Sequence, residues 1–166
     1  MCSSDLSLRI VRDGRSDLPG PLSQLGLGRD GTVYVIAAGV AYHAGATFYP
    51  RQDNWRAIGI EAEHPGVGTW TPAQYDAYVR LVDALRKHYG VPLSNVQGHK
   101  EIAKPLGRKV DPTFDCARFR ADVAGLAKRD QRIAKLEKAR ARKAKWQRWV
   151  ARANKNIARL KGLTKS

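Results

Sequence analysis

Apolar residues alternate with polar ones in short stretches across residues 22–63, and glycines separate these stretches. This two-residue period is typical of β-strands that bury one face. Arg29-Asp30-Gly31 separates residues 22–27 from residues 32–37, and an Asp-Gly pair tolerates the positive φ of a short hairpin turn. The pattern therefore predicts a β-hairpin.

A third strand is predicted over residues 57–63, where the apolar positions continue at the same period. That period places Glu61 and Glu63 on one face of the strand. Residues 91–97 are predicted to form a short link and a strand that leads to His99. Two acidic side chains therefore face the same way, and a histidine is expected at the end of a strand.

An amphipathic helix is predicted between these strands. Thr71 has the side chain of an N-cap, Pro72 suits the first helical position, and Gln74 is placed to complete a capping box. Gly90 supplies a C-terminal stop. A helical spacing of three and four places on one face Tyr75, Tyr78, Val82, Leu85 and Tyr89. This face is predicted to pack on the sheet.

Two further helical patterns lie toward the C-terminus. Asp115 is a suitable cap for a helix whose inward face holds Phe119, Val123 and Leu126. In the tail beyond this helix, apolar residues recur at a spacing of three and four, which Lys143 interrupts. They are Leu136, Ala139, Trp146, Val150, Ala153, Ile157 and Leu160. This spacing predicts a basic amphipathic helix. Strands and amphipathic helices mixed in this way favour an α/β sandwich.

Charge divides the chain of 166 residues into two parts. The formal net charge is +15, but residues 128–166 carry +13 of it and residues 1–127 only +2. A domain boundary is therefore predicted near Ala127, and the charge is a property of the tail. No apolar run approaches the ~20 residues of a membrane-spanning helix, and no signal-peptide pattern opens the chain. With two cysteines, synthesis in a reducing cytoplasm is expected.

His99 and Asp111 are the first candidates for chemistry. A His that ends a strand and an Asp fixed by Pro112, joined by a loop with Gly and Pro, are able to present two ligand atoms to one zinc ion. Lys109 lies two residues before Asp111 and points to the same side of an extended segment, where its charge would stabilise an oxyanion. Taken alone, a His and Asp pair of this kind is weak evidence for a metal site.

Six motifs, in order along the chain, carry a resemblance to a known family. They are Asp-Gly-Thr-Val at 30–33, Tyr-His-Ala-Gly at 42–45, Asn54 with Ile-Gly-Ile-Glu at 58–61, Thr-Pro-Ala-Gln at 71–74, Gly-His-Lys-Glu at 98–101 and Gly-Arg-Lys-Val-Asp-Pro at 107–112. Residues 7–127 resemble type 2 N-acetylmuramoyl-L-alanine amidases, which share the peptidoglycan recognition protein fold. They look most like the amidase domain of endolysins from phages of actinobacteria. The resemblance implies a mixed central β-sheet flanked by helices, followed by the basic C-terminal helix.

The resemblance also implies an activity and the residues that perform it. Such enzymes are zinc hydrolases that cut the amide between N-acetylmuramic acid and L-alanine in peptidoglycan, here in phage lysis after release from the host cytoplasm. Motif matching makes His99 and Asp111 zinc ligands, Glu61 the general base and Lys109 the residue that stabilises the oxyanion. His43 matches a histidine near the cleft, where contact with substrate is expected. A monomer is expected.

Other side chains have competing interpretations. Trp55 and Trp70 flank the strand of Glu61, where they either line a cleft for sugar and peptide or pack at its rim. Arg108 either binds a carboxylate of the peptide or is solvated. Surface or packing roles are favoured for Glu63, His64, His88 and Cys116.

One ligand of the family is missing from this sequence. The first zinc ligand of the family is a histidine on the opening strand, and residues 1–42 contain no histidine. The chain is either a relative that binds peptidoglycan without cutting it or an incomplete copy of an active enzyme. The second explanation is favoured, because residues 2–6 match the translated end of a common sequencing adapter. We therefore expect residues 1–6 to be a non-native or disordered start and residues 7–127 to lack the first strand.

The tail has several candidate partners. Trp146 and Trp149 in a basic helix suit adhesion to anionic wall polymers, contact with a membrane surface or a link to an absent wall-binding domain, and a solvated helix competes equally. Nucleic-acid binding is supported by charge alone, since no DNA-binding motif is recognised. The preferred function is amide hydrolysis, with a peptidoglycan-binding module and a nucleic-acid-binding protein as alternatives.

Overall fold

The computed structural model describes residues 3–49 and 52–163 and divides into two compact units, Met1–Ala124 and Gly125–Ser166. The first unit holds a three-stranded mixed sheet and a two-stranded one. The elements in chain order are α1 (Ser3–Asp13), β1 (Gly14–Arg15), β2 (Leu18–Pro19), β3 (Leu25–Leu27), β4 (Val33–Val35), β5 (Ile60–Ala62), α2 (Pro72–Tyr89), the 3-10 helix η1 (Leu93–Asn95), α3 (His99–Ile102) and α4 (Cys116–Leu163).

Strands β3 and β4 form the predicted hairpin. They pair antiparallel, with Gly26 opposite Tyr34. In the turn, the Asp30 carboxylate accepts hydrogen bonds from the backbone N–H of Thr32 at 2.9 Å and from its hydroxyl at 2.8 Å, and Gly31 has a φ of +90°. The Asp-Gly turn is therefore confirmed, although each strand is only three residues long and so shorter than predicted.

Strand β5 pairs in parallel with the other edge of β3, which gives the strand order β4-β3-β5. Gly26 is the partner of Glu61, so both residues point to the same face of the sheet. Helix α1 lies on that face, because a Cβ built on Gly26 would be 3.3 Å from the Leu8 side chain. Residues 3–6, expected to be non-native or disordered, lie in α1, and Met1 and Cys2 lie outside the described residues.

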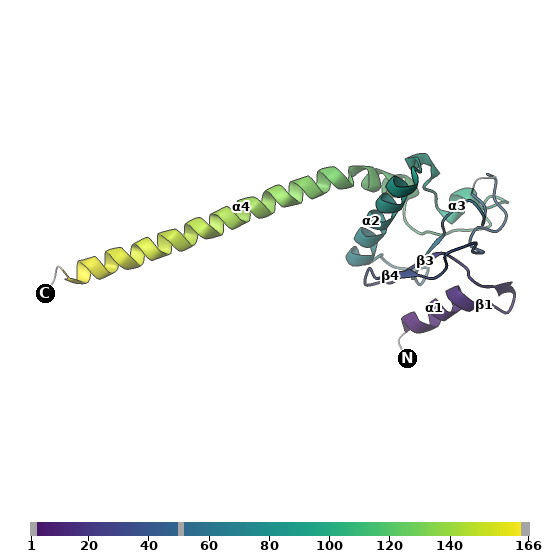
Figure 1. Ribbon diagram of the computed structural model, residues 1–166, viewed down its shortest axis with the longest axis horizontal. Coiled ribbons are helices and arrows are strands. Elements are labelled where there is room, and N and C mark those ends of the chain that lie inside the picture. The colour runs from purple at the N-terminus through teal and green to yellow at the C-terminus, as the bar shows by residue number, and fades with distance from the viewer. Residues whose placement is uncertain (1–2, 50–51, 164–166) are drawn as a thin grey trace. The chain divides into compact units, whose positions relative to one another are not determined.

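Helix α2 lies on the opposite side of the sheet from α1 (Figure 1). Thr71 is its N-cap and accepts from the backbone N–H of Gln74, and Gly90 ends it with a φ of +66°. The predicted capping box is wrong. The fully buried Gln74 amide instead donates to the carbonyls of Leu27 at 3.4 Å and Glu63 at 2.7 Å, and so joins α2 to the sheet.

The segment before His99 differs from the prediction. No strand forms over residues 91–97, where Leu93–Asn95 is a 3-10 helix. His99 opens helix α3, because the Glu101 carboxylate accepts the backbone N–H of Gly98 at 2.8 Å and so caps the first turn. The sequence signal was present, since Glu101 stands three residues after Gly98.

The core of the first unit lies between α2 and the first turns of α4. Asp115 caps α4 as predicted, and buried in its first turns are Cys116, Phe119, Val123 and Leu126. Ring centroids 4.9 to 6.1 Å apart join Trp70, Tyr75, Tyr78, Phe114 and Phe119. Tyr89 departs from the prediction: it is 62% exposed and packs edge-on against His88.

In the second unit, α4 continues to Leu163 as the expected basic helix. Its large apolar side chains are not covered: Leu136 is 57% exposed, Trp146 63% and Trp149 66%. Among residues 3–49 and 52–163, we find no helix with the length and hydropathy needed to cross a membrane.

Candidate active site

The structure brings His99 and Asp111 together. His99 opens α3 and Asp111 lies in the loop that follows it, and the His99 Nδ1 atom is 3.2 Å from the Asp111 Oδ2 atom. This separation is close to the ~3.3 Å between two ligand atoms on one tetrahedral zinc ion, given zinc–ligand distances of about 2.0–2.2 Å. The two side chains therefore converge on a common point.

The other side of the His99 ring fixes its orientation. Nε2 lies 3.1 Å from the Ala44 carbonyl oxygen, which accepts a hydrogen bond but donates none. Nδ1 and the Asp111 carboxylate then face each other with no proton left for them in a neutral ring. The two acceptor atoms, His99 Nδ1 and Asp111 Oδ2, are compatible with each other when a second ring proton or a shared cation lies between them.

The donor set fits two positions of a zinc site. A ring nitrogen and a carboxylate oxygen are zinc ligands of the usual kind, and the carbonyl behind the ring is the usual outer partner. Within the described part of the chain, no group of three or more His, Cys, Asp and Glu side chains is placed to hold a metal ion. The residues at hand therefore provide two of the three protein ligands expected.

Glu61 lies within electrostatic reach of this pair. Burial among protein atoms raises the pKa of Glu61, and the negative charge of Asp111 raises it further. The charges of His99 and Lys109 act in the opposite direction. The Glu61 carboxylate still reaches solvent at the edge of the sheet. A carboxylate with a raised pKa beside a candidate metal site has the properties of a general base.

Asp111 has the opposite perturbation. Its side-chain contact with His99 lowers the pKa of the Asp111 carboxyl, and the charges of His99 and Lys109 act in the same direction. Asp111 is therefore ionised at neutral pH, as a metal ligand must be. Lys109 is half-buried and adds positive charge near both carboxylates.

His43 packs directly on the Glu61 strand. A Cβ built on Gly59 would lie 2.4 Å from the His43 Cγ atom, so only glycine leaves room for the ring. Its Nε2 atom is 3.2 Å from the Ala57 carbonyl oxygen. Burial lowers the pKa of His43, and so the ring is neutral at pH 7.

The remaining candidates are less closely joined to the site. Arg108 donates to the backbone carbonyls of Ala44 and Ala46, so it fastens the turn beside His43, and its contact with substrate stays a prediction. Trp55 is 77% exposed. Trp70 belongs to the aromatic core, where its ring stacks on His64 at 4.6 Å.

Sequence reasoning missed the residues that hold the site in place. The Asn54 side chain accepts the backbone N–H of Ala44 at 2.8 Å, and the Gln24 side chain accepts that of Gly59 at 2.7 Å. Asn54 occurs in one of the six motifs, but nothing in the sequence showed which backbone group it binds. These are long-range contacts, which local patterns do not encode.

Comparison with known proteins agrees with this geometry. Residues 3–114 match the Amidase_2 family, described as N-acetylmuramoyl-L-alanine amidase. The chain is 37% identical over 99 residues to the 1,6-anhydro-N-acetylmuramyl-L-alanine amidase AmpD of Citrobacter freundii, covering 57% of this chain and 53% of that protein. For the AmpD of Enterobacter cloacae the identity is 36% over 97 residues, covering 56% and 52%. The chain thus spans about half the length of the curated relatives it matches.

Solved structures show the same fold. A selenomethionine derivative of AmpD superposes with a TM-score of 0.51 at 35% identity, covering 60% of this chain and 57% of that one. The N-acetylmuramoyl-L-alanine amidase LysC from Clostridium intestinale has a TM-score of 0.51 at 23% identity, covering 65% and 68%, and supports the fold alone. The expected type 2 amidase fold is confirmed. Because the family match extends over more than half of its residues, this chain belongs to the N-acetylmuramoyl-L-alanine amidase family.

Proposed function

We propose that this protein hydrolyses the amide between the lactyl group of N-acetylmuramic acid and L-alanine in peptidoglycan, with zinc as cofactor. The convergence of His99 and Asp111 at 3.2 Å carries the proposal. Family membership supports the reaction class. Glu61 and Lys109 support the mechanism, because the charges of His99 and Asp111 act on the pKa of Glu61 and the charge of Lys109 acts on the pKa of Asp111.

Each residue has a distinct role in the proposed reaction. When bound, a zinc ion supplies Lewis acidity and lowers the pKa of water, so that a nucleophile is available at neutral pH. Glu61 accepts the proton of the attacking water and delivers it to the leaving nitrogen of L-alanine. Lys109 stabilises the negative charge that develops on the carbonyl oxygen as the C–O bond forms and before the C–N bond breaks.

Zinc binding is the most direct test of the proposed ligands. His99 and Asp111 without a third protein ligand are expected to hold zinc more weakly than a complete site. The assay is therefore run with added zinc, after removal of metal with a chelator. In the wild-type chain, we expect activity to return when zinc is added. In H99A and D111A, we expect metal binding to be lost. Unchanged metal binding in either variant would contradict the proposed site.

Release of soluble stem peptide from purified cell walls tests the reaction itself. Hydrolysis liberates new amino groups on L-alanine, which are quantified by chemical labelling. Wall binding without liberated amino groups would identify a non-catalytic peptidoglycan-binding module instead. Retention of the chain on DNA, with no affinity for walls, would favour the nucleic-acid-binding alternative.

The relatives suggest a second substrate for the same site. The AmpD proteins are named as amidases of 1,6-anhydro-N-acetylmuramyl-L-alanine, whereas the substrate in our primary proposal is the intact wall. Comparing kcat/KM for a soluble 1,6-anhydromuramyl peptide with that for intact walls distinguishes the two. A preference for intact walls would also support the proposed role as a phage endolysin, which rests on the motif resemblance.

We also propose that the basic tail adheres to anionic wall polymers. Residues 128–166 carry +13, and the exposed rings of Trp146 and Trp149 lie on the same helix. Such a segment is attracted to dense negative charge whatever the chemistry of the amidase unit. The partner is therefore expected to bind the tail in a salt-dependent manner.

A further inference from the structure

Lys100 directly follows the candidate zinc ligand His99 and binds the loop that carries the other candidate ligand, Asp111. Its backbone N–H donates to the Asp111 carbonyl at 2.7 Å. Its ammonium group donates to the Pro112 carbonyl at 2.7 Å and to the Phe114 carbonyl at 2.8 Å. The residue next to His99 is thus bound by three hydrogen bonds to the loop that carries Asp111.

The next residue anchors the other side of the His99 turn. The Glu101 carboxylate accepts the backbone N–H of Gly98 at 2.8 Å and two hydrogen bonds from Arg120 of α4 at 2.9 and 3.0 Å. Arg120 also donates to the Val96 carbonyl at 3.1 Å. The Glu101 carboxylate thus links the Gly98 backbone, directly before His99, to Arg120 of α4.

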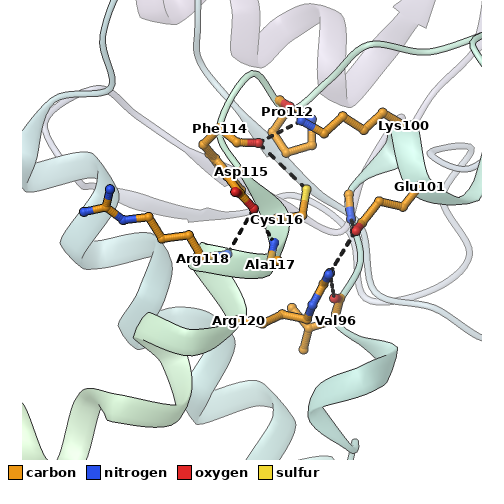
Figure 2. Close-up of polar contacts among 11 residues, drawn as sticks. Val96, Lys100, Glu101, Pro112, Phe114, Asp115, Cys116, Ala117, Arg118 and Arg120 are labelled. Atoms are coloured by element: carbon orange, nitrogen blue, oxygen red, sulfur yellow. Dashed lines mark hydrogen bonds and ion pairs between the residues drawn. The ribbon is translucent and has the colours of Figure 1, made fainter.

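Figure 2 shows the contacts of Lys100 and of Glu101 together, around the start of α4. The Lys100 side chain extends to Pro112 and Phe114, and the Glu101 side chain meets Arg120. The Gly98 backbone packs closely against its neighbours, since a Cβ on Gly98 would lie 2.6 Å from Pro112 and 2.7 Å from the Cys116 sulfur. The backbone directly before His99 therefore packs against both the loop that carries Asp111 and the first turn of α4.

We propose that Lys100, assisted by the Glu101–Arg120 ion pair, is a positioning residue that sets the distance between the His99 imidazole and the Asp111 carboxylate. The role rests on the proposed zinc site, but it concerns how the ligands are held before a metal arrives. The Lys100 ammonium group donates two hydrogen bonds to backbone carbonyls of the loop that carries Asp111. Its role is therefore to hold this loop in place rather than to add charge to the surface.

The first readout needs no metal. In the wild-type chain, we expect nuclear Overhauser contacts between the ring protons of His99 and the Hβ protons of Asp111. K100M removes the ammonium donors with little change in side-chain length and is expected to abolish these contacts. K100R keeps donors in place and is expected to retain them. K104M, at an exposed lysine on the same segment, is the matched control and should behave as wild type.

The second readout is zinc affinity, measured by competition with a chromophoric chelator. Loss of an outer positioning partner is expected to weaken zinc binding by about 10- to 100-fold in K100M, with recovery in K100R. If K100M fails to fold, R120K tests the same scaffold, because it leaves Lys100 intact but removes the paired hydrogen bonds to Glu101. A folded K100M or R120K with wild-type ring contacts and wild-type zinc affinity would overturn the proposal.

The two readouts separate this inference from the proposed function. Ring contacts that depend on Lys100, in a chain that binds no zinc, would support the positioning role and refute the zinc site. Zinc binding that requires His99 and Asp111 but is the same in K100M would support the zinc site and refute the positioning role.

Discussion

At the scale of single residues, the proposed general base Glu61 gives the most direct test of the proposed hydrolysis. E61Q should lower amide hydrolysis by at least about 100-fold, because the attacking water loses its base, while zinc affinity stays unchanged. The measurement is kcat with a soluble muramyl peptide. E63Q is the matched control, since Glu63 follows two residues later and has no assigned role in the reaction. Hydrolysis by E61Q at the wild-type rate would exclude Glu61 as the base.

The raised pKa of Glu61 also predicts how stability depends on pH. The folded chain holds the Glu61 proton more tightly than the unfolded chain does, because burial disfavours the carboxylate. Stability is therefore lost as pH rises from the ordinary glutamate pKa through the raised one. E61Q removes this cost, so its free energy of unfolding should exceed that of wild type at pH 7 but not below about pH 4. Urea titrations at the two pH values check the sign.

Gly59 is the other residue on which the site geometry depends. In G59A the new Cβ would overlap the His43 ring, which must move and lose its contact with the Ala57 carbonyl. We expect KM for the muramyl peptide to rise about tenfold if His43 orients substrate, with a smaller change in kcat. G39A is the control, because nothing lies within 4 Å of a Cβ at that position. An unchanged KM in G59A would remove His43 from the substrate site.

At the scale of elements, the contact between α2 and the sheet depends on Gln74. Q74L should cost about 1–3 kcal/mol of unfolding free energy, because the buried carbonyls of Leu27 and Glu63 lose a donor. Urea denaturation measures this cost. Q147L, at an exposed position of α4, should change the stability by less than about 0.5 kcal/mol. Equal stability of Q74L and wild type would show that the amide is not needed there.

Elements could be predicted from sequence where their signals are local. The Asp30-Gly31 turn and the Thr71 and Gly90 helix ends follow from short-range backbone preferences. The expected strand before His99 is wrong: Leu93–Asn95 form a 3-10 helix instead, and the Val96 carbonyl binds the Arg120 side chain rather than a neighbouring strand. The partners of Gln74 are carbonyls 47 and 11 residues away in sequence, and a local pattern carries no information about them.

The same division applies to the site. Residue type and spacing were enough to select His99 and Asp111 as a pair, and the structure places them 3.2 Å apart. Their support by Ala44, Lys100 and Arg120 comes from three separate segments that meet only on folding. The contacts that hold the site therefore had to be read from the structure.

At the scale of the whole molecule, charge and chemistry are carried by different residues. A chain ending at residue 127 should hydrolyse a soluble muramyl peptide at the wild-type rate but be poorly retained on purified walls. The full chain should elute from walls as salt is raised above physiological strength, since exposed charges are then screened. Two variants separate the contribution of charge from that of the tryptophans. In the first, the Lys and Arg residues of the tail are replaced by Gln, and in the second, W146A/W149A, the two indole rings are removed. Salt-independent retention would contradict an electrostatic role.

Helix α4 begins in the amidase unit with the buried Phe119 and runs without a break to Leu163. A trypsin-like protease finds its cleavage residues crowded into the last part of this helix, where the side chains are exposed. Because residues 128–166 carry +13 of the net charge of +15, cleavage at the start of this part of the helix would convert a strongly cationic protein into a nearly neutral one without removing His99, Asp111 or Glu61. Loss of the tail would thus remove the segment proposed to bind anionic polymers and leave the proposed catalytic residues in the amidase unit.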